Sequence, residues 1–135
     1  MIGDAARRGV DTRVLTAGIH TDVKSTLYAG RARYEELMEA GVRMYEYRNT
    51  MMHAKTVVVD GKFSVVGSSN MDVRSKELNM ENVLGILDTG FARQLEETFF
   101  DDLKNAKEID PVEWRKHGLL KKLTERVCSL FAEQY

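Results

Sequence analysis

The feature that most constrains the fold is a pair of apolar runs on either side of Asp60-Gly61-Lys62. Because Asp-Gly between apolar runs is a strong tight-turn signal, the sequence predicts a β-hairpin with strands at 53–60 and 63–66. A nucleophile candidate, a cation, two hydroxyls and a carboxamide stand at fixed offsets around this hairpin: His53, Lys55, Ser68, Ser69 and Asn70. We therefore expect this hairpin to carry the chemistry of the chain.

A histidine and a lysine precede the first apolar run. Side chains alternate in direction along an extended strand, so His53 and Lys55 are expected on the same face, about 6–7 Å apart. An imidazole and an ammonium that converge suit phosphate-ester chemistry, because the ring nitrogen can attack phosphorus while the cation holds the charged oxygens. An unpaired ammonium among apolar residues is costly to bury, which a phosphate partner would explain. The other histidines, His20 and His117, have no such neighbours and are interpreted as surface residues.

Six fixed positions of the motif H-x-K-x4-D-x6-G-S-x-N are present in the chain. They are His53, Lys55, Asp60, Gly67, Ser68 and Asn70. This spacing resembles the signature of the phospholipase D superfamily, and the flanking segments are similar to those of bacterial cardiolipin synthases. Those segments are residues 40–47, 70–75 and 78–81. The resemblance is to the C-terminal half of that family and runs over nearly the whole chain.

The resemblance implies a role for each polar motif position in phosphodiester chemistry. His53 matches the histidine that either attacks phosphorus as nucleophile or serves as the general acid. Lys55 and Asn70 match the groups that hold the nonbridging phosphate oxygens, and Ser68 matches a helper in that task. Ser69 is interpreted as a turn residue, since serine favours turns in any case.

Two carboxylates complete the set of site residues that the resemblance implies. Asp60 matches the motif aspartate, which is interpreted as a turn and hydrogen-bonding residue of chiefly structural importance. Glu81 lies in the position of the carboxylate that hydrogen-bonds the histidine ring and fixes its tautomer. The scheme requires no metal ion and no cofactor.

The order of the predicted elements indicates an α/β fold with a mixed β-sheet flanked by helices. Strand, helix and strand in succession suggest a right-handed parallel crossover before the hairpin. Predicted helices cover residues 2–8, 22–40 and 90–106, and predicted strands outside the hairpin cover 12–16, 42–47 and 82–88. Gly9 and Gly41 are predicted to end the first two helices. The resemblance implies a phospholipase D-like half domain that lacks its first strand, because the chain begins inside the family's first helix.

At 135 residues the chain is expected to have a single hydrophobic core. The expected division is a catalytic half domain at 1–106 and an amphipathic helical tail at 107–135. In the tail, apolar residues recur on one side of a helix and basic residues lie outside that stripe. Two interpretations stay open: the tail lies on an anionic membrane, or it packs on the chain's own sheet with a solvated basic face.

Charge, cysteine content and apolar run length indicate which partners and which cellular location suit the chain. The 20 basic and 21 acidic residues give a net charge of −1, which argues against a general nucleic-acid binder. A lone cysteine, Cys128, fits a reducing compartment. No run approaches the roughly 18 apolar residues that a membrane-spanning helix needs. The resemblance implies a peripheral location at the cytoplasmic face of the bacterial cell membrane.

The resemblance implies a phosphatidyltransferase of the cardiolipin synthase type, which joins two phosphatidylglycerols through a phosphohistidine intermediate. Enzymes of this family bring two such motifs together at one site, whereas the chain holds one. We therefore expect it to pair with a second motif-bearing half or with a second copy of itself.

Three alternatives remain open from the sequence. The chain could be a homodimeric nuclease or phosphodiesterase of the same superfamily, a non-catalytic lipid-binding module, or an inactive fragment. The near-neutral charge and the basic, apolar tail favour lipid over nucleic acid as the partner.

Overall fold

The computed structural model describes residues 2–21, 24–68 and 82–116, and the chain forms two compact units. Unit 1 comprises Met1–Met52 and Asn105–Tyr135, and unit 2 comprises His53–Lys104. The described strands form two three-stranded sheets. The α/β class with helices flanking β-structure is confirmed.

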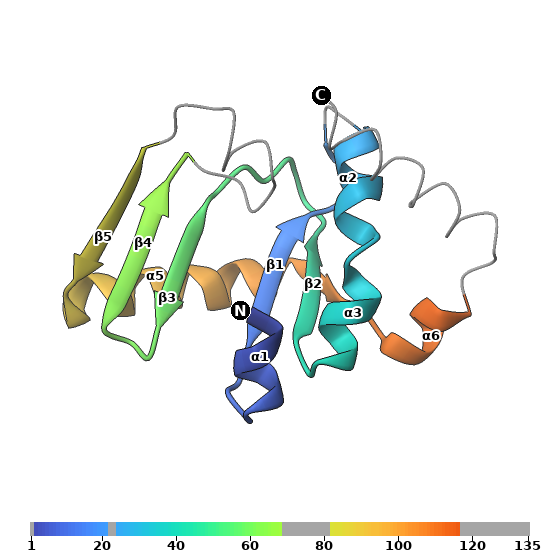
Figure 1. Ribbon diagram of the computed structural model, residues 1–135. Helices are drawn as coiled ribbons and strands as arrows, with labels where there is room; N and C mark the ends of the chain where they lie inside the picture. The colour runs from blue at the N-terminus through green and yellow to red at the C-terminus, as the bar shows by residue number, and fades with distance from the viewer. Residues whose placement is uncertain (1, 22–23, 69–81, 117–135) are drawn as a thin grey trace. The chain divides into compact units, whose positions relative to one another are not determined.

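A mixed three-stranded sheet forms the centre of unit 1. β1 (Arg13–Ala17), β2 (Arg43–Tyr47) and β6 (Ala106–Glu108) pair in the order β1-β2-β6. Figure 1 shows β1 and β2 side by side. β1 and β2 are parallel, as predicted, and β6 is antiparallel to β2. The sequence does not predict β6, because Ala-Lys-Glu lacks the branched apolar residues that mark a strand.

The boundary expected after residue 106, between the catalytic half domain and the tail, falls within β6. β6 begins at Ala106 and pairs with β2, so the residues on both sides of that position belong to unit 1. α6 (Pro111–Arg115) follows, and the carboxylate of Asp110 caps it by accepting from the Val112 and Glu113 N–H groups. The rest of the expected tail, residues 117–135, lies outside the described residues.

Two glycines end helices of unit 1, as the sequence predicts. α1 (Ile2–Arg7) is followed by Gly9 and α3 (Tyr34–Glu39) by Gly41, with φ values of 90° and 97°. Glycine adopts this left-handed conformation without steric cost and so leaves the chain free to turn back. Each turn places the following residues at the start of β1 or β2.

The single helix predicted over residues 22–40 is wrong, because two helices occupy this stretch. α2 (Lys24–Arg31) and α3 are separated by residues 32 and 33. Gly30 lies in the last turn of α2, where glycine costs about 1 kcal/mol relative to alanine. The Arg33 N–H donates to the Gly30 carbonyl at 3.2 Å, a tighter turn than the α-helix. Apolar periodicity alone does not reveal such a break.

Five buried apolar side chains form the core of unit 1. They are Tyr34, Val42, Met44, Ile109 and Trp114. The rings of Tyr34 and Trp114 lie 5.2 Å apart between centroids, so α3 packs on α6 although 80 residues separate them in sequence. This core therefore unites the two sequence segments of unit 1.

An ion pair is buried beside this core. Arg31 of α2 donates to Glu46 of β2 through Nε and Nη2, at 2.7 and 2.8 Å. The two side chains are only 11% and 10% exposed. The pair ties α2 to the sheet, and its burial leaves little water to replace either partner.

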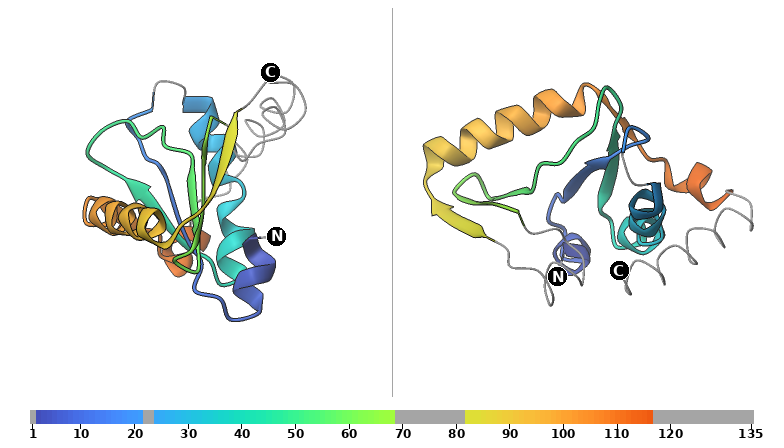
Figure 2. Two further views of the ribbon diagram at one scale, coloured as in Figure 1. Left: turned by 90° about the vertical axis from the view of Figure 1, so that its left-hand side faces the viewer. Right: turned by 90° about the horizontal axis from the view of Figure 1, so that it is seen from above.

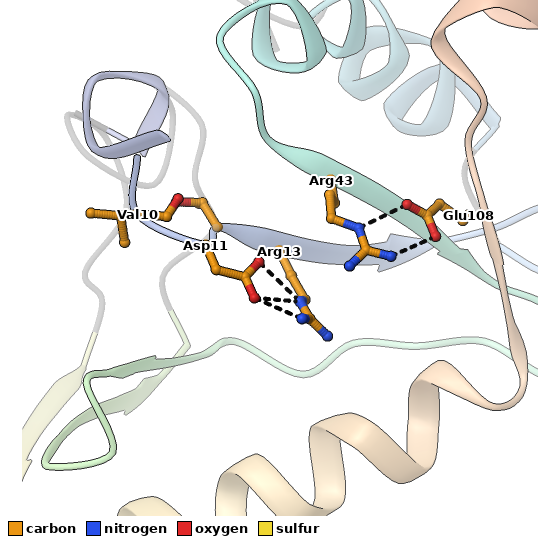
Figure 3. A network of polar contacts seen from close by, with 6 residues as sticks. Val10, Asp11, Arg13, Arg43 and Glu108 are labelled. Atoms are coloured by element: carbon orange, nitrogen blue, oxygen red, sulfur yellow. Dashed lines mark hydrogen bonds and ion pairs between the residues drawn. The ribbon is translucent and has the colours of Figure 1, made fainter. Parts of the chain in front are cut away.

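A second bidentate pair lies at the surface of unit 1. Arg43 of β2 donates to Glu108 of β6 through Nε and Nη2, both at 2.9 Å, while Arg13 pairs with Asp11 (Figure 3). The hydrogen bond from Arg43 lowers the pKa of the Glu108 carboxyl. Because both side chains of this pair are nearly half exposed, water screens it and its contribution to stability is small.

The described residues of unit 2 form an antiparallel sheet and one helix. β3 (Thr56–Val59), β4 (Phe63–Gly67) and β5 (Val83–Leu87) pair in the order β3-β4-β5. α5 (Thr89–Leu103) lies across one face of this sheet (Figures 1 and 2). The predicted hairpin, strand and helix are confirmed, although β3 begins three residues later than expected. No helix in the described ranges is long and apolar enough to cross a bilayer.

The hairpin turn has the backbone geometry that Asp-Gly favours. Asp60 and Gly61 both adopt positive φ, at 52° and 61°. The Lys62 N–H donates to the Val59 carbonyl at 3.1 Å. Positive φ at both central residues marks a type I′ turn, whose twist matches that of the flanking strands.

A small buried side chain lies between the sheet and α5. Ser64 of β4 and Ala92 of α5 are both fully buried. The Ser64 hydroxyl has no hydrogen-bond partner within the part of the chain that the structure describes. Burying a hydroxyl without a partner opposes folding, so serine at position 64 lowers the free energy of unfolding.

Replacing Glu46 with glutamine should destabilise the protein by about 3–5 kcal/mol, because it removes the buried carboxylate that accepts both hydrogen bonds from the Arg31 guanidinium. Chemical denaturation measures the free energy of unfolding. The matched control is Glu108→Gln, which breaks an exposed bidentate pair and should cost at most about 1 kcal/mol. Equal losses from the two variants would contradict the importance of burial at Glu46.

The variant Ser64→Ala should be more stable than the wild type by about 1 kcal/mol, because it removes a buried hydroxyl that has no partner. The midpoint of thermal or denaturant unfolding measures this gain. A clear loss of stability would show that the hydroxyl forms a hydrogen bond in solution.

Candidate active site

Two segments of the predicted motif and the residue before β5 meet at one end of the unit 2 sheet. His53 and Lys55 precede β3, Ser68 follows β4, and Asn82 precedes β5 (Figure 1). Backbone hydrogen bonds hold these segments together: the Gly67 N–H donates to the Lys55 carbonyl at 3.1 Å, and the Ser68 N–H donates to the Asn82 carbonyl at 2.9 Å. The antiparallel order of the strands therefore gathers residues that are up to 29 positions apart.

His53 and Lys55 lie in the segment before β3 rather than within the strand. The imidazole of His53 belongs to an exposed residue. The Lys55 Nζ donates to the backbone carbonyl of His53 at 2.9 Å. This hydrogen bond places the Lys55 ammonium close to the His53 backbone.

Gly67 allows the close approach of β5 to the end of β4. A Cβ atom at this position would lie 2.3 Å from the Asn82 carbonyl oxygen and 3.0 Å from the Val83 Cα. Both obstacles are backbone atoms, which cannot swing away as the end of a side chain can. The close approach of β5 to the end of β4 therefore explains why the motif has a glycine at position 67.

The Ser68 side chain bonds to the strand that follows. Its Oγ accepts from the Asn82 N–H at 3.1 Å, while its own N–H donates to the Asn82 carbonyl. Ser68 is predicted to help hold phosphate, and in the structure its side chain also pairs with Asn82. The sequence does not single out Asn82, because an asparagine before a strand is an ordinary turn residue.

Two expected site residues, Asn70 and Glu81, lie outside the described residues, as does Ser69, which is predicted to be a turn residue. Ser68 and Asn82, the described residues on either side of this stretch of sequence, pair with each other.

Asp60 lies at the other end of the hairpin from His53. The whole of β3, roughly 13 Å of strand, separates the turn from the segment that holds the histidine. Asp60 adopts a φ of 52°, a conformation that aspartate tolerates better than most residues. This placement agrees with its interpretation as a turn residue.

A separate open cavity of about 420 Å³ lies in unit 1. It is bordered by both members of the buried Arg31–Glu46 pair and by Trp114, and none of the expected site residues lines it. Among the described residues, no group of three potential ligands is placed to hold a metal ion.

Two solved structures have the same fold. The phospholipase D family member Nuc from Salmonella typhimurium superposes with a TM-score of 0.68 at 20% identity, over 79% of this chain and 69% of that one. Phosphatidylserine synthase from Haemophilus influenzae superposes with a TM-score of 0.65 at 17% identity, over 98% of this chain and 35% of that one. The fold is thus of the phospholipase D type.

Sequence comparison identifies the family to which the chain belongs within this type of fold. The model described as "Cardiolipin synthase, PLD-like domain" matches residues 1–103. The chain is 37% identical over 128 residues to cardiolipin synthase of Geobacillus thermodenitrificans, and 35% identical over 131 residues to cardiolipin synthase A of Proteus mirabilis. It belongs to the phospholipase D-like domain family of cardiolipin synthases. The alignments cover 95% and 97% of the chain but 25% and 27% of these relatives, so it spans about a quarter of their length.

Replacing Gly67 with alanine should destabilise unit 2 by more than about 1 kcal/mol, because the new methyl group would displace the Asn82 backbone. Amide hydrogen exchange at Ser68 and Asn82 would report the loss of their pairing. The control is Gly30→Ala, where a Cβ meets nothing within 4 Å and helix propensity should improve. Unchanged protection at Ser68 in Gly67→Ala would contradict the assigned role of this glycine.

Proposed function

We propose that the chain is the catalytic half of a phosphatidyltransferase of the cardiolipin synthase type. Family membership supports this proposal, and so does one observation above all: the histidine, lysine and serine segments of the motif converge at a single end of the unit 2 sheet. The substrate is phosphatidylglycerol, presented at an anionic membrane surface. The chain acts there as a peripheral protein on the cytoplasmic face.

The first step forms a phosphohistidine. A neutral ring nitrogen of His53 attacks the phosphorus of one phosphatidylglycerol, and the bond between phosphorus and the glycerol headgroup oxygen breaks. A second histidine, from the paired motif, donates a proton to the departing glycerol. The phosphatidyl group remains covalently bound to the imidazole.

The second step releases the product. A hydroxyl of another phosphatidylglycerol loses its proton to the second histidine and attacks the same phosphorus. The nitrogen–phosphorus bond breaks, which restores neutral His53 and yields cardiolipin. Each histidine thus returns to its starting protonation state.

Charged and polar groups stabilise both steps. Lys55, with Ser68 and Asn70, would hold the nonbridging oxygens while negative charge builds on them. Glu81 would accept a hydrogen bond from the far nitrogen of the His53 ring and stabilise its positive charge in the intermediate. The exposed position of His53 leaves it open to a lipid headgroup.

The chemistry needs two histidines in opposite protonation states, and the chain carries one motif. We propose that the second comes from another motif-bearing half, with a second copy of this chain as the alternative. Paired activity would then depend on the partner's concentration.

The decisive experiment measures cardiolipin formation in phosphatidylglycerol vesicles, by the chain alone and in a mixture with the N-terminal half of the Geobacillus thermodenitrificans enzyme. Turnover should appear in the mixture, or with rising concentration of the chain if it pairs with itself. His53→Ala should lower it at least about 100-fold. His20→Ala, an exposed histidine outside the motif, is the matched control and should retain full activity.

Full activity from a strictly monomeric chain would contradict the pairing. Preferential cleavage of single-stranded DNA over lipid, measured at two salt concentrations, would favour the nuclease alternative. Vesicle binding that survives His53→Ala, with no turnover under any condition, would instead identify a lipid-binding module.

A further inference from the structure

The open cavity of unit 1, about 420 Å³ in volume, lies at the carboxyl ends of β1 and β2. Gly18 and Ile19 line it just after β1, and Tyr47 and Arg48 line it at the end of β2. In open α/β sheets, ligands bind beyond the carboxyl ends of parallel strands. The cavity is also large enough for a small organic molecule, so its position and volume are those of a ligand-binding pocket.

Contacts within unit 1 hold two walls of this cavity in place. A Cβ atom at Gly18 would overlap the Tyr47 carbonyl oxygen, so this glycine allows the ends of β1 and β2 to approach closely. On the other wall, the Trp114 ring packs against the Tyr34 ring at 5.2 Å, and the Asp110 carboxylate caps α6. The backbone around the cavity is therefore organised before a ligand binds.

Six charged side chains line the cavity: Arg31, Arg48, Lys107, Glu46, Asp110 and Glu113. Two of them neutralise each other, because the Arg31 guanidinium donates to both oxygens of Glu46. Two cations and two carboxylates remain, and no ion pair joins any two of these four side chains. The cavity thus has charges of both signs that do not satisfy one another.

The two signs of charge come from different elements. Lys107 of β6 lies opposite Glu46 of β2, and the backbone of Arg48 extends this ladder beyond the end of β2. Both basic side chains therefore lie on the face of the sheet that bears Glu46. Asp110 caps α6, and Glu113 lies in its first turn. The sheet supplies the positive charges of the cavity, and α6 supplies the negative ones.

We propose that this cavity binds a small zwitterion that carries a primary ammonium and a singly charged phosphate diester. The phosphate contacts Arg48 and Lys107, both of which are side-chain types that bind phosphate. The ammonium contacts Asp110 and Glu113. A ligand with one charge of each sign complements both pairs, whereas a simple anion or cation would be repelled by one of them.

This site goes beyond the proposed catalytic function. All of its residues belong to unit 1, and none of the motif residues lines the cavity. Ligand binding here requires neither a second motif nor turnover.

Trp114 provides a direct test, because it lines the cavity and is the only tryptophan of the chain. Its fluorescence is titrated with glycerophosphoethanolamine and with two fragments that each carry one of its charges, dimethyl phosphate and ethanolamine. The zwitterion should bind at least about 10-fold more tightly than either fragment, since it makes charged hydrogen bonds at both ends.

Two substitutions identify which end of the ligand each side of the cavity binds. Lys107→Gln should weaken the binding of the zwitterion and of dimethyl phosphate about 10-fold, but not that of ethanolamine. Glu113→Gln should weaken the binding of the zwitterion and of ethanolamine, but not that of dimethyl phosphate. The matched controls are Arg33→Gln and Glu36→Gln, which remove exposed charges outside the cavity and should bind all three probes as the wild type does.

A lipid and a free molecule can present the same zwitterionic group. Vesicles that contain phosphatidylethanolamine distinguish these sources. A Trp114 response to the vesicles that Glu113→Gln abolishes would support the proposal with a lipid headgroup as the ligand. A response to the soluble probe alone would support it with a free zwitterion as the ligand.

Equal affinity for the zwitterion and for either fragment would overturn the proposal. So would binding that both Lys107→Gln and Glu113→Gln leave intact, in variants whose circular dichroism shows them to be folded. Unchanged Trp114 fluorescence with every probe, together with no heat of binding by calorimetry, would overturn it as well. None of these measurements requires turnover, so a failure here is distinguishable from a failure of the catalytic proposal.

Discussion

The arrangement of the candidate site depends on two backbone contacts at the end of β4. The Gly67 N–H reaches the Lys55 carbonyl on one side, and Ser68 pairs with Asn82 on the other. Together they bring the segments before β3 and before β5 to the same end of one sheet. The close approach at Asn82 requires the absence of a side chain at position 67, so the glycine contributes as much to the site's geometry as the polar residues do.

The two units are stabilised by different means. Unit 1 has a core of large side chains and a buried ion pair that joins a helix to the sheet. Among its described residues, unit 2 has one helix on a small sheet, a fully buried Ser64 and several exposed apolar side chains on its strands. The unit that carries the motif thus exposes more of its described large apolar side chains than unit 1 does.

Local patterns in the sequence predicted local structure well. The Asp-Gly turn, the two glycine helix ends and the parallel β1–β2 pair are all confirmed, because each depends on a few neighbouring residues or on a short connection. The break between α2 and α3 and the additional strand β6 were not predicted, because neither depends on neighbouring residues alone. Whether the chain stays helical beyond Gly30, and whether Ala106–Glu108 becomes a strand, depends on contacts with distant residues.

Sequence alone determined the chemistry that is available: the identity and spacing of His53, Lys55 and Ser68, and the turn that folds the hairpin. Only the tertiary structure decided which residues meet and that Asp60 lies away from the histidine. The physical reason is that spacing along a chain limits distance only within one element. Proximity between strands is decided by hydrogen-bond register and by the side chains that permit close backbone approach.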